Sequence, residues 1–244
     1  MVITSVENEK IKNLCKLEKK KYRDMTNTYL IEGEHLVIEA FKANVLDEIF
    51  VLEGSNFDID VKTTEVSYEV MKKLSSMDTP INVIGLCHKK CNNDIIGNRV
   101  VLLDELQDPG NLGTIIRSSL AFNVDTIILS ENTVDLYNSK VLRATQGMHF
   151  HINIISMASS DAIMKLKEDN YLILGTNVEN GIDVRDVEPS LKEKFCLIMG
   201  NEGNGVRKEI QAMCDKNLYI NTNSKVESLN VGVACSILLY ELGR

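Results

Sequence analysis

The chain has 244 residues, 44% of them hydrophobic and 25% charged, with a formal net charge of −8 at pH 7. This length suits one large or two modest domains, and the composition is ordinary for a globular protein. No apolar run approaches the roughly 20 residues that cross a bilayer, and the N-terminus lacks a signal-peptide core, so we expect a cytoplasmic protein. The acidic charge argues against simple nonspecific coating of nucleic acid, which needs a basic surface.

The first 95 residues alternate short predicted helices and strands. Residues 4–7 have the pattern of a capping box, and the helix that it opens carries Ile11, Leu14 and Leu17. Apolar periodicity then predicts a strand at 28–31, a helix at 34–42, a strand at 48–52, a helix at 66–74 and a strand at 81–86. Together these elements predict a small α/β domain with its own core.

A cluster of basic residues stands out in this acidic chain. Between Lys10 and Arg23 there are seven basic residues and a single acid, Glu18. The simplest interpretation is a solvated helix face followed by a loop. The alternative is a local phosphate-contacting patch, whose residues would be Lys19, Lys20, Lys21 and Arg23.

Polar residues at 89–94 interrupt the apolar pattern, and we place a domain boundary near residue 95, which gives domains 1–95 and 96–244. The second domain has predicted strands at 100–103, 126–129, 152–155, 171–174, 196–199 and 218–220. Its predicted helices lie at 112–122, 136–144, 161–168 and 206–214, and a last helix follows Leu229. Continuous apolar strands that alternate with helices predict a mostly parallel sheet covered on both faces.

The six cysteines are scattered along the chain, which in a cytosolic protein indicates free thiols. Cys87, His88 and Cys91 form the only cluster. A structural zinc site needs about four ligands and no second pair lies nearby, so we expect no metal.

A glycine-rich loop, Gly200-Asn-Glu-Gly-Asn-Gly205, follows a late apolar strand. It is not a phosphate loop, because Val206 and Arg207 stand where lysine and serine or threonine should be. It is not a dinucleotide fingerprint either, since the glycine spacing differs and the loop does not open the domain. The glycines allow a ligand to approach the backbone closely, and Glu202 can accept hydrogen bonds from a ligand or a neighbouring loop.

Asp108-Pro109-Gly110-Asn111 is a predicted tight turn, with Asn111 as the cap of the following helix. Arg117 lies off the apolar stripe of that helix. A solvent-facing arginine is the usual outcome for such a residue. The functional alternative is a contact with phosphate or ribose at the carboxyl edge of the sheet, where open α/β sheets bind their ligands.

The last helix, which ends near Leu242, is apolar nearly all round. Such a helix is buried on more than one side. We therefore predict that it contributes to a subunit interface as well as to a core, the alternative being a well-buried terminal helix in a monomer.

Three segments, in order, resemble the motifs of the SpoU-type RNA ribose 2′-O-methyltransferases of the SPOUT superfamily. Asn111-Leu-Gly-Thr-Ile-Ile-Arg117 is similar to the first, and Ile198-Met-Gly-Asn-Glu-Gly-Asn-Gly205 is similar to the second. The third is matched by Ile220, Ser228-Leu-Asn-Val-Gly-Val-Ala234 and Leu239-Tyr-Glu241. The N-terminal residues 29–40 resemble the ribosomal-protein-like substrate-binding domain that such enzymes often carry. The sequence departs from the family at Asn221, where proline is usual, and at 143–148, which match a small-residue stretch only loosely.

The resemblance implies a C-terminal parallel-sheet α/β domain with a deep trefoil knot, and a small N-terminal α/β domain. It implies S-adenosylmethionine as cofactor, an RNA substrate (23S rRNA first, tRNA second), and a homodimer formed through the C-terminal domain. The implied cofactor-binding residues are Thr176, Asn177, Gly200, Asn201, Gly203, Ile220, Ser228 and Leu229. The implied catalytic residues are Arg117, Asn111, Glu202, Ser228 and Asn230. Lys19, Lys20, Lys21 and Arg23 would then contact the RNA.

The resemblance implies that a methyl group passes from S-adenosylmethionine to a ribose 2′-hydroxyl. In that reaction, Arg117 would hold a phosphate and the developing alkoxide. It is a poor base, because the pKa of arginine lies above about 12.

Two other classes of function stay open. A non-catalytic RNA-binding or ribosome-assembly protein would keep the fold, but the intact catalytic set argues against it. A Rossmann-type enzyme would need a glycine and acid pattern that Asp104-Glu-Leu-Gln-Asp-Pro-Gly110 does not supply.

Overall fold

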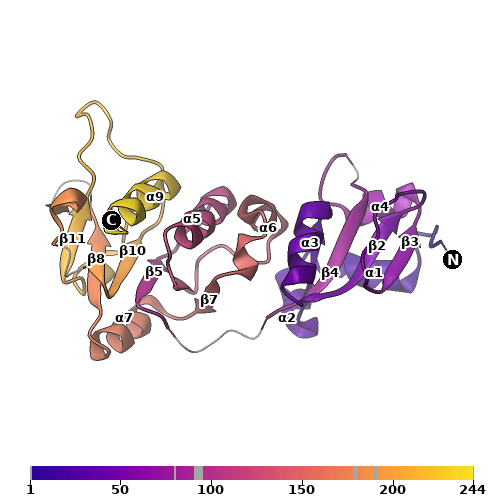
Figure 1. Cartoon of the computed structure of the whole chain (residues 1–244), viewed down its shortest axis with the longest axis horizontal. Helices are drawn as coiled ribbons and strands as arrows, with labels where there is room; N and C mark the ends of the chain where they lie inside the picture. Colours follow the sequence, from indigo (N-terminus) through magenta and orange to yellow (C-terminus); the bar gives the residue numbers. More distant parts are fainter. Residues whose placement is uncertain (1, 80, 91–95, 178–180, 189–191, 244) are drawn as a thin grey trace. The chain divides into compact units, whose positions relative to one another are not determined.

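The computed structural model in Figure 1 describes residues 2–79, 81–90, 96–177, 181–188 and 192–243. The chain divides into two compact units, and each of them draws on two stretches of sequence. Unit 1 comprises Met1–Cys91 and Asp135–Phe150, and unit 2 comprises Asn92–Val134 and His151–Arg244. The boundary expected near residue 95 falls at 91–95, which lie outside the described residues. No helix in the described ranges is both long enough and apolar enough to span a membrane.

Unit 1 contains a four-stranded sheet of order β1-β4-β2-β3. The strands are β1 (Thr28–Glu32), β2 (Leu46–Leu52), β3 (Thr63–Val66) and β4 (Val83–His88). Strand β4 is antiparallel to β1 and β2, and β3 is parallel to β2. Side chains alternate along β2, so that Ile49 and Val51 enter one core and Phe50 enters the other.

Helices cover both faces of this sheet. The helices of unit 1 are α1 (Glu9–Lys16), α2 (Lys20–Thr26), α3 (Glu34–Lys42), α4 (Tyr68–Leu74), α6 (Ser139–Thr145) and the 3-10 turn η1 (Met148–Phe150). One core joins β2 to α1 and α4. The other contains Leu36 and Val37 of α3 together with Leu142 of α6 and Phe150 of η1. Residues 135–150 therefore complete the core of unit 1 although they lie far along the sequence.

Unit 2 contains a seven-stranded sheet of order β7-β6-β5-β10-β8-β11-β9, and every neighbouring pair is parallel. The strands are β5 (Arg99–Leu103), β6 (Thr126–Leu129), β7 (Asn153–Ser156), β8 (Leu172–Thr176), β9 (Ile182–Asp183), β10 (Phe195–Met199) and β11 (Lys216–Tyr219). Along β5 all of residues 100–103 are buried, although successive side chains point to opposite faces. The prediction of a parallel sheet covered on both faces is confirmed.

The helices of unit 2 are α5 (Pro109–Ala121), α7 (Ser159–Glu168), the short α8 (Lys208–Gln211), α9 (Val231–Leu242) and the 3-10 turn η2 (Val184–Asp186). Figure 1 shows α5 and α9 side by side. The hydroxyl oxygens of Ser118 and Ser236 lie 2.6 Å apart across this contact. Helix α9 buries Cys235, Leu238, Leu239 and Leu242, whereas Val233 and Tyr240 are exposed. The last helix thus presents an apolar outer face in addition to its core face.

Two expectations about helix starts are wrong. Helix α1 begins at Glu9, later than a capping box at 4–7 requires, because Asn8 is its cap and accepts a hydrogen bond from the Lys10 amide. The segment from Val66 does not begin as a helix. Val66 ends β3, and Ser67 caps α4 instead.

Candidate active site

Unit 2 contains a cleft of about 730 Å³ at the carboxyl ends of β8, β10 and β11. The size falls within the range of roughly 300–1,000 Å³ that is typical of small-molecule sites. Its walls come from three segments at and beyond the ends of these strands, within 176–177, 199–206 and 218–229, together with parts of α8 and α9. All eight residues expected to bind a cofactor line this cleft: Thr176, Asn177, Gly200, Asn201, Gly203, Ile220, Ser228 and Leu229.

The loop after β10 folds back on itself and forms one wall of the cleft. Backbone hydrogen bonds join Asn201 and Gly205 in both directions, at 3.0 and 2.9 Å. Gly205 has a φ of 68°, a left-handed conformation that favours glycine. A Cβ on Gly200 would lie 2.1 Å from the carbonyl carbon of Gly205 and from the amide nitrogen of Val206. The tight shape of this loop therefore requires glycine at position 200.

A chain of hydrogen bonds connects the three sequence motifs. Glu202 Oε1 accepts from Asn111 Nδ2 at 3.1 Å, and Asn111 Oδ1 accepts from Asn230 Nδ2 at 2.8 Å. Asn230 Oδ1 in turn accepts from the amides of residues 232 and 233 and caps α9. Three residues that lie far apart in the sequence thereby fix the start of α5, the loop after β10 and the start of α9 relative to one another.

Glu202 also accepts hydrogen bonds from the backbone amides of Asp108, at 2.8 Å, and Gln107, at 3.1 Å. The partial shielding of the Glu202 carboxylate from water would by itself raise its pKa. The hydrogen bonds from Asn111 and from these two amides outweigh it and hold the pKa below its usual value. The carboxylate is therefore ionised at neutral pH and committed to holding the loop, which makes it unsuitable as a proton acceptor.

The helix cap at the start of α5 differs from the prediction. Asp108 is the cap, because its Oδ1 accepts a hydrogen bond of 2.8 Å from the Asn111 amide. Asn111 lies inside the first turn of the helix. Its side chain is thereby free to join Glu202 to Asn230.

A buried ion pair that the sequence did not reveal lies behind the same loop. Asp104 has no exposed surface, and its carboxylate accepts from Arg207 Nη2 at 2.6 Å and from Arg207 Nε at 3.1 Å to each oxygen. Ser159 Oγ donates to the same carboxylate at 2.6 Å. Burial opposes ionisation of Asp104, but these hydrogen bonds prevail and lower its pKa. The sequence held one signal of this pair. Asp104 directly follows the buried strand β5, and Arg207 directly follows the loop after the buried strand β10.

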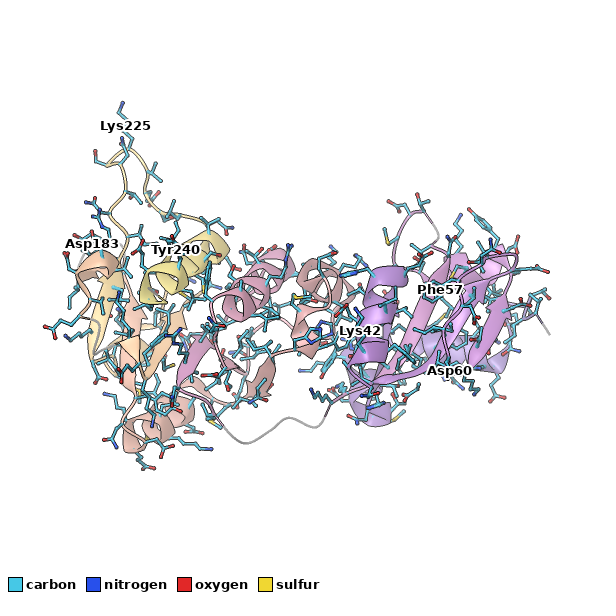
Figure 2. The ribbon with its side chains drawn as sticks, viewed as in Figure 1. Lys42, Phe57, Asp60, Asp183, Lys225 and Tyr240 are labelled. Carbon is cyan, nitrogen blue, oxygen red and sulfur yellow. The ribbon has the colours of Figure 1, made fainter. Side chains whose placement is uncertain are left out.

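Arg117 lies outside the lining of the cleft. It is exposed on α5, six residues beyond Asn111, or about 9 Å along the helix axis at 1.5 Å per residue. Within the described parts of the chain its guanidinium has no hydrogen-bond or ion-pair partner. Ser228 is exposed in the loop 220–230, which Figure 2 shows extending outwards with Lys225 near its tip.

The predicted basic patch divides into two parts in unit 1. Lys19, Lys20 and Lys21 are exposed at the start of α2. Arg23 is buried: its Nη1 donates to the carbonyls of Leu17 and Glu18 at 2.7 and 2.6 Å, and its Nη2 pairs with Asp135. The guanidinium of Arg23 thus holds unit 1 together and is not presented to solvent.

The cysteine cluster is only partly described, because Cys91 lies outside the described residues. Cys87 is buried as a free thiol, and His88 Nδ1 lies 2.8 Å from Asp47 Oδ1. Among the residues with described positions, no three His, Cys, Asp or Glu side chains are grouped as metal ligands.

Comparison with known proteins covers both units. Residues 98–240 match the model of the SpoU rRNA Methylase family, and residues 8–85 match the MRM3-like substrate binding domain. The chain is 38% identical over 245 residues to the 23S rRNA (guanosine(2553)-2′-O)-methyltransferase RlmP of Bacillus subtilis, with 98% of each protein covered. It is 33% identical to the uncharacterized tRNA/rRNA methyltransferase MG252 of Mycoplasma genitalium, over 84% of this chain and 82% of that one.

Solved structures agree with this relationship. The crystal structure of an AdoMet-bound rRNA methyltransferase from Sinorhizobium meliloti superimposes with a TM-score of 0.88 at 28% identity and covers 99% of this chain and 97% of that one. The α/β fold, with the parallel sheet of unit 2, is therefore that of SPOUT methyltransferases. The family model spans more than half of the sequence, and the chain belongs to the SpoU rRNA methylase family.

Proposed function

We propose that this chain transfers a methyl group from S-adenosylmethionine to the 2′-hydroxyl of a ribose in 23S rRNA, and that the target nucleoside is guanosine. The observation that carries the proposal is the hydrogen-bond chain Glu202–Asn111–Asn230, which joins the three family motifs beside a ligand-sized cleft. The choice of RNA and of nucleoside follows the name of the Bacillus subtilis relative, which aligns over nearly the whole of both proteins.

The cleft suits S-adenosylmethionine in size and in chemistry. Apolar side chains of Leu218, Ile220 and Leu238 offer a surface for the adenine ring, while the loop backbone around Gly200 offers amides and carbonyls for hydroxyl and charged groups. Gly200 lets the loop stay compact, which keeps its backbone at the wall of the cleft. When bound, the cofactor supplies a methyl group that is activated by its positively charged sulfur.

The chain's own residues have to place the ribose hydroxyl, stabilise the charge left when its proton passes to a phosphate of the RNA or to another acceptor, and exclude water. We assign Arg117 to phosphate and to the developing alkoxide, because its guanidinium is exposed and has no partner among the described residues. Glu202, Asn111 and Asn230 fix the loops through the hydrogen bonds described above. We assign Ser228 to a contact with the ribose or the cofactor, which its exposed position in the lining of the cleft supports.

We further propose that the chain forms a homodimer through the outer face of α9. Val233 and Tyr240 on this face are exposed in the single chain, and exposed apolar side chains grouped on one helix mark an interaction surface. Arg117 belongs to α5, which packs against α9, and it lies outside the lining of its own chain's cleft. A homodimer offers a way to bring Arg117 of one chain to the cleft of its partner.

Unit 1 would select the RNA, as its match to a substrate binding domain supports. Lys19, Lys20 and Lys21 are exposed there and available to phosphates. An acidic protein with one basic patch suits recognition of a single folded RNA site by shape. Transfer RNA is the second candidate substrate, in line with the tRNA/rRNA naming of the Mycoplasma genitalium relative.

The competing hypothesis is a non-catalytic RNA-binding protein of the same fold. The intact hydrogen-bond chain favours an enzyme, and so does the guanidinium of Arg117, which has no partner among the residues whose positions are described. The test is a map of 2′-O-methyl groups in rRNA from a strain without the gene, complemented by the wild-type or the Arg117→Ala chain. We expect one methylated ribose to vanish, and to return with the wild type alone. An unchanged map would overturn the assignment to rRNA.

A further inference from the structure

The loop after β10 is attached to one short segment of the chain at three separate points. The attachment residues are Asn201, Glu202 and Arg207, and each of them has a hydrogen-bond partner in segment 104–111. This segment directly follows β5, the neighbour of β10 in the sheet. The loop is therefore held against the adjacent strand end at its start and at its finish.

Of the three attachments, the one at the end of the loop, between Arg207 and Asp104, is the most deeply buried. Asp104 is wholly buried and Arg207 is half-buried, whereas Glu202 is exposed. Besides the guanidinium contacts, the backbone amide of Arg207 donates to Asp104 Oδ2 at 3.2 Å. A buried carboxylate is tolerated only when it is paired and hydrogen-bonded. The pair therefore fixes both the side chain and the backbone of Arg207.

A displacement of Arg207 would be passed on to the wall of the cleft. Val206 precedes Arg207, lines the cleft and is buried. The Val206 amide nitrogen and the Gly205 carbonyl carbon lie so close to Gly200 that no side chain fits there. The two hydrogen bonds between Asn201 and Gly205 close the loop further. With no spare room in the loop, movement at its end must move Gly200.

We propose that Asp104 and Arg207 form a positioning pair for the cofactor. The pair holds the backbone of 200–206 in the shape that binds S-adenosylmethionine, and it acts through that loop because neither residue lines the cleft. The cofactor's identity rests on the proposed function, whereas the mechanical role of the pair rests on the contacts of unit 2 alone.

The experiment is a calorimetric titration of the full-length chain with S-adenosylhomocysteine. Arg207→Ala should weaken binding by about ten-fold or more, because it leaves a buried carboxylate unpaired and releases the loop. Arg185→Ala is the matched control. Arg185 makes a comparable pair through Nε and Nη2 with the buried Asp183, but neither residue lines the cleft or contacts the loop. The control should bind within about two-fold of wild type.

Two further measurements separate positioning from loss of fold. Millimolar guanidinium should restore much of the affinity of Arg207→Ala, and should leave the Arg185→Ala control unchanged. If Arg207→Ala does not fold, Arg207→Lys takes its place, since lysine keeps the charge and loses the two-pronged geometry. This variant should keep the fold and lose affinity.

The possible outcomes are distinguishable. Wild-type affinity in a folded Arg207→Ala or Arg207→Lys chain would overturn the positioning pair and leave the proposed function intact. Equal losses of affinity in Arg207→Ala and Arg185→Ala would also overturn it, because the loss would then follow from breaking any ion pair in unit 2. A wild-type chain that binds no S-adenosylhomocysteine would overturn the proposed cofactor, and the positioning role with it.

Discussion

Replacement of Glu202 by glutamine should weaken the cofactor site while leaving unit 2 folded. The carboxylate accepts three hydrogen bonds: Oε1 from the Asp108 amide and Asn111 Nδ2, and Oε2 from the Gln107 amide. Glutamine has nearly the same shape, but its NH₂ group is a donor. At least one of the three donors must then face another donor, and the loop loses part of its attachment to segment 104–111.

The magnitude follows from these contacts. A hydrogen bond to a charged group contributes about 1.5–3 kcal/mol when it is protected from water. Glu202 is exposed, so water competes for the same donors and the full sum does not apply. A net loss of about 1–2 kcal/mol is reasonable, and this corresponds to roughly a 5- to 30-fold loss of cofactor affinity.

The assay is a calorimetric titration with S-adenosylhomocysteine. Glu131→Gln is the matched control, because it removes the same charge from an exposed position of unit 2 that does not line the cleft. A folded Glu202→Gln chain that binds as tightly as this control would refute the role of Glu202 as the anchor of the loop.

The pH dependence gives a second readout. The pKa of Glu202 is held below its usual value, so its ionised form stabilises the folded unit above the unfolded-state pKa of about 4.3. That contribution falls as the pH drops through the lower folded-state pKa. The difference in unfolding free energy between wild type and Glu202→Gln should be constant above about pH 5 and should shrink below about pH 4. A difference that grows on acidification would contradict the sign of the pKa shift.

Three other substitutions test separate parts of the account. Arg117→Ala should retain cofactor binding, and its rate of methyl transfer in single turnovers should fall by about 10²–10³. If Arg117 serves the cleft of the partner chain, mixing this variant with Glu202→Ala should restore activity. No recovery would show that Arg117 serves the cleft of its own chain. Gly200→Ala should weaken cofactor binding more than ten-fold, since its Cβ would lie 2.1 Å from the loop backbone, and calorimetry would show an unchanged affinity if the loop can relax. Leu142→Ala should destabilise unit 1 by about 2–5 kcal/mol, seen as lost hydrogen-exchange protection in β1 and α3; unchanged protection would mean that α6 is dispensable to this core.

Local sequence patterns predicted the strands of unit 2 well, because strands covered on both faces are continuous apolar runs. Residues 100–103 and 126–129 are examples, and both lie within or match observed strands. The short strands β3 and β9 were missed. Strand β9 has only two residues and exists through its pairing with β11, a contact that no local pattern encodes.

Long-range contacts account for the other differences. Nothing near Leu142 or Phe150 indicates that they complete the core of unit 1, since their partners in α3 lie about a hundred residues earlier. Burial of Arg23 depends in the same way on Asp135. A basic cluster read along the sequence cannot distinguish Arg23 from the exposed Lys19.

The candidate site was predicted through the resemblance, and the eight expected cofactor residues all line one cleft. The Asp104–Arg207 pair was missed for two reasons. Its residues lie 103 positions apart in the sequence, and neither belongs to one of the three motifs. The trefoil knot, the homodimer and the roles of individual site residues stay predictions.

The most direct test of the central claim is methyl transfer in a purified system. Wild-type protein is incubated with methyl-labelled S-adenosylmethionine and 23S rRNA from a strain that lacks the gene, and the RNA is digested to nucleosides for mass spectrometry. The account predicts label in a single 2′-O-methylguanosine, and labelling about 10²–10³ times slower when Arg117→Ala replaces the wild type. Label on a base, or unlabelled RNA despite cofactor binding by the protein, would contradict it.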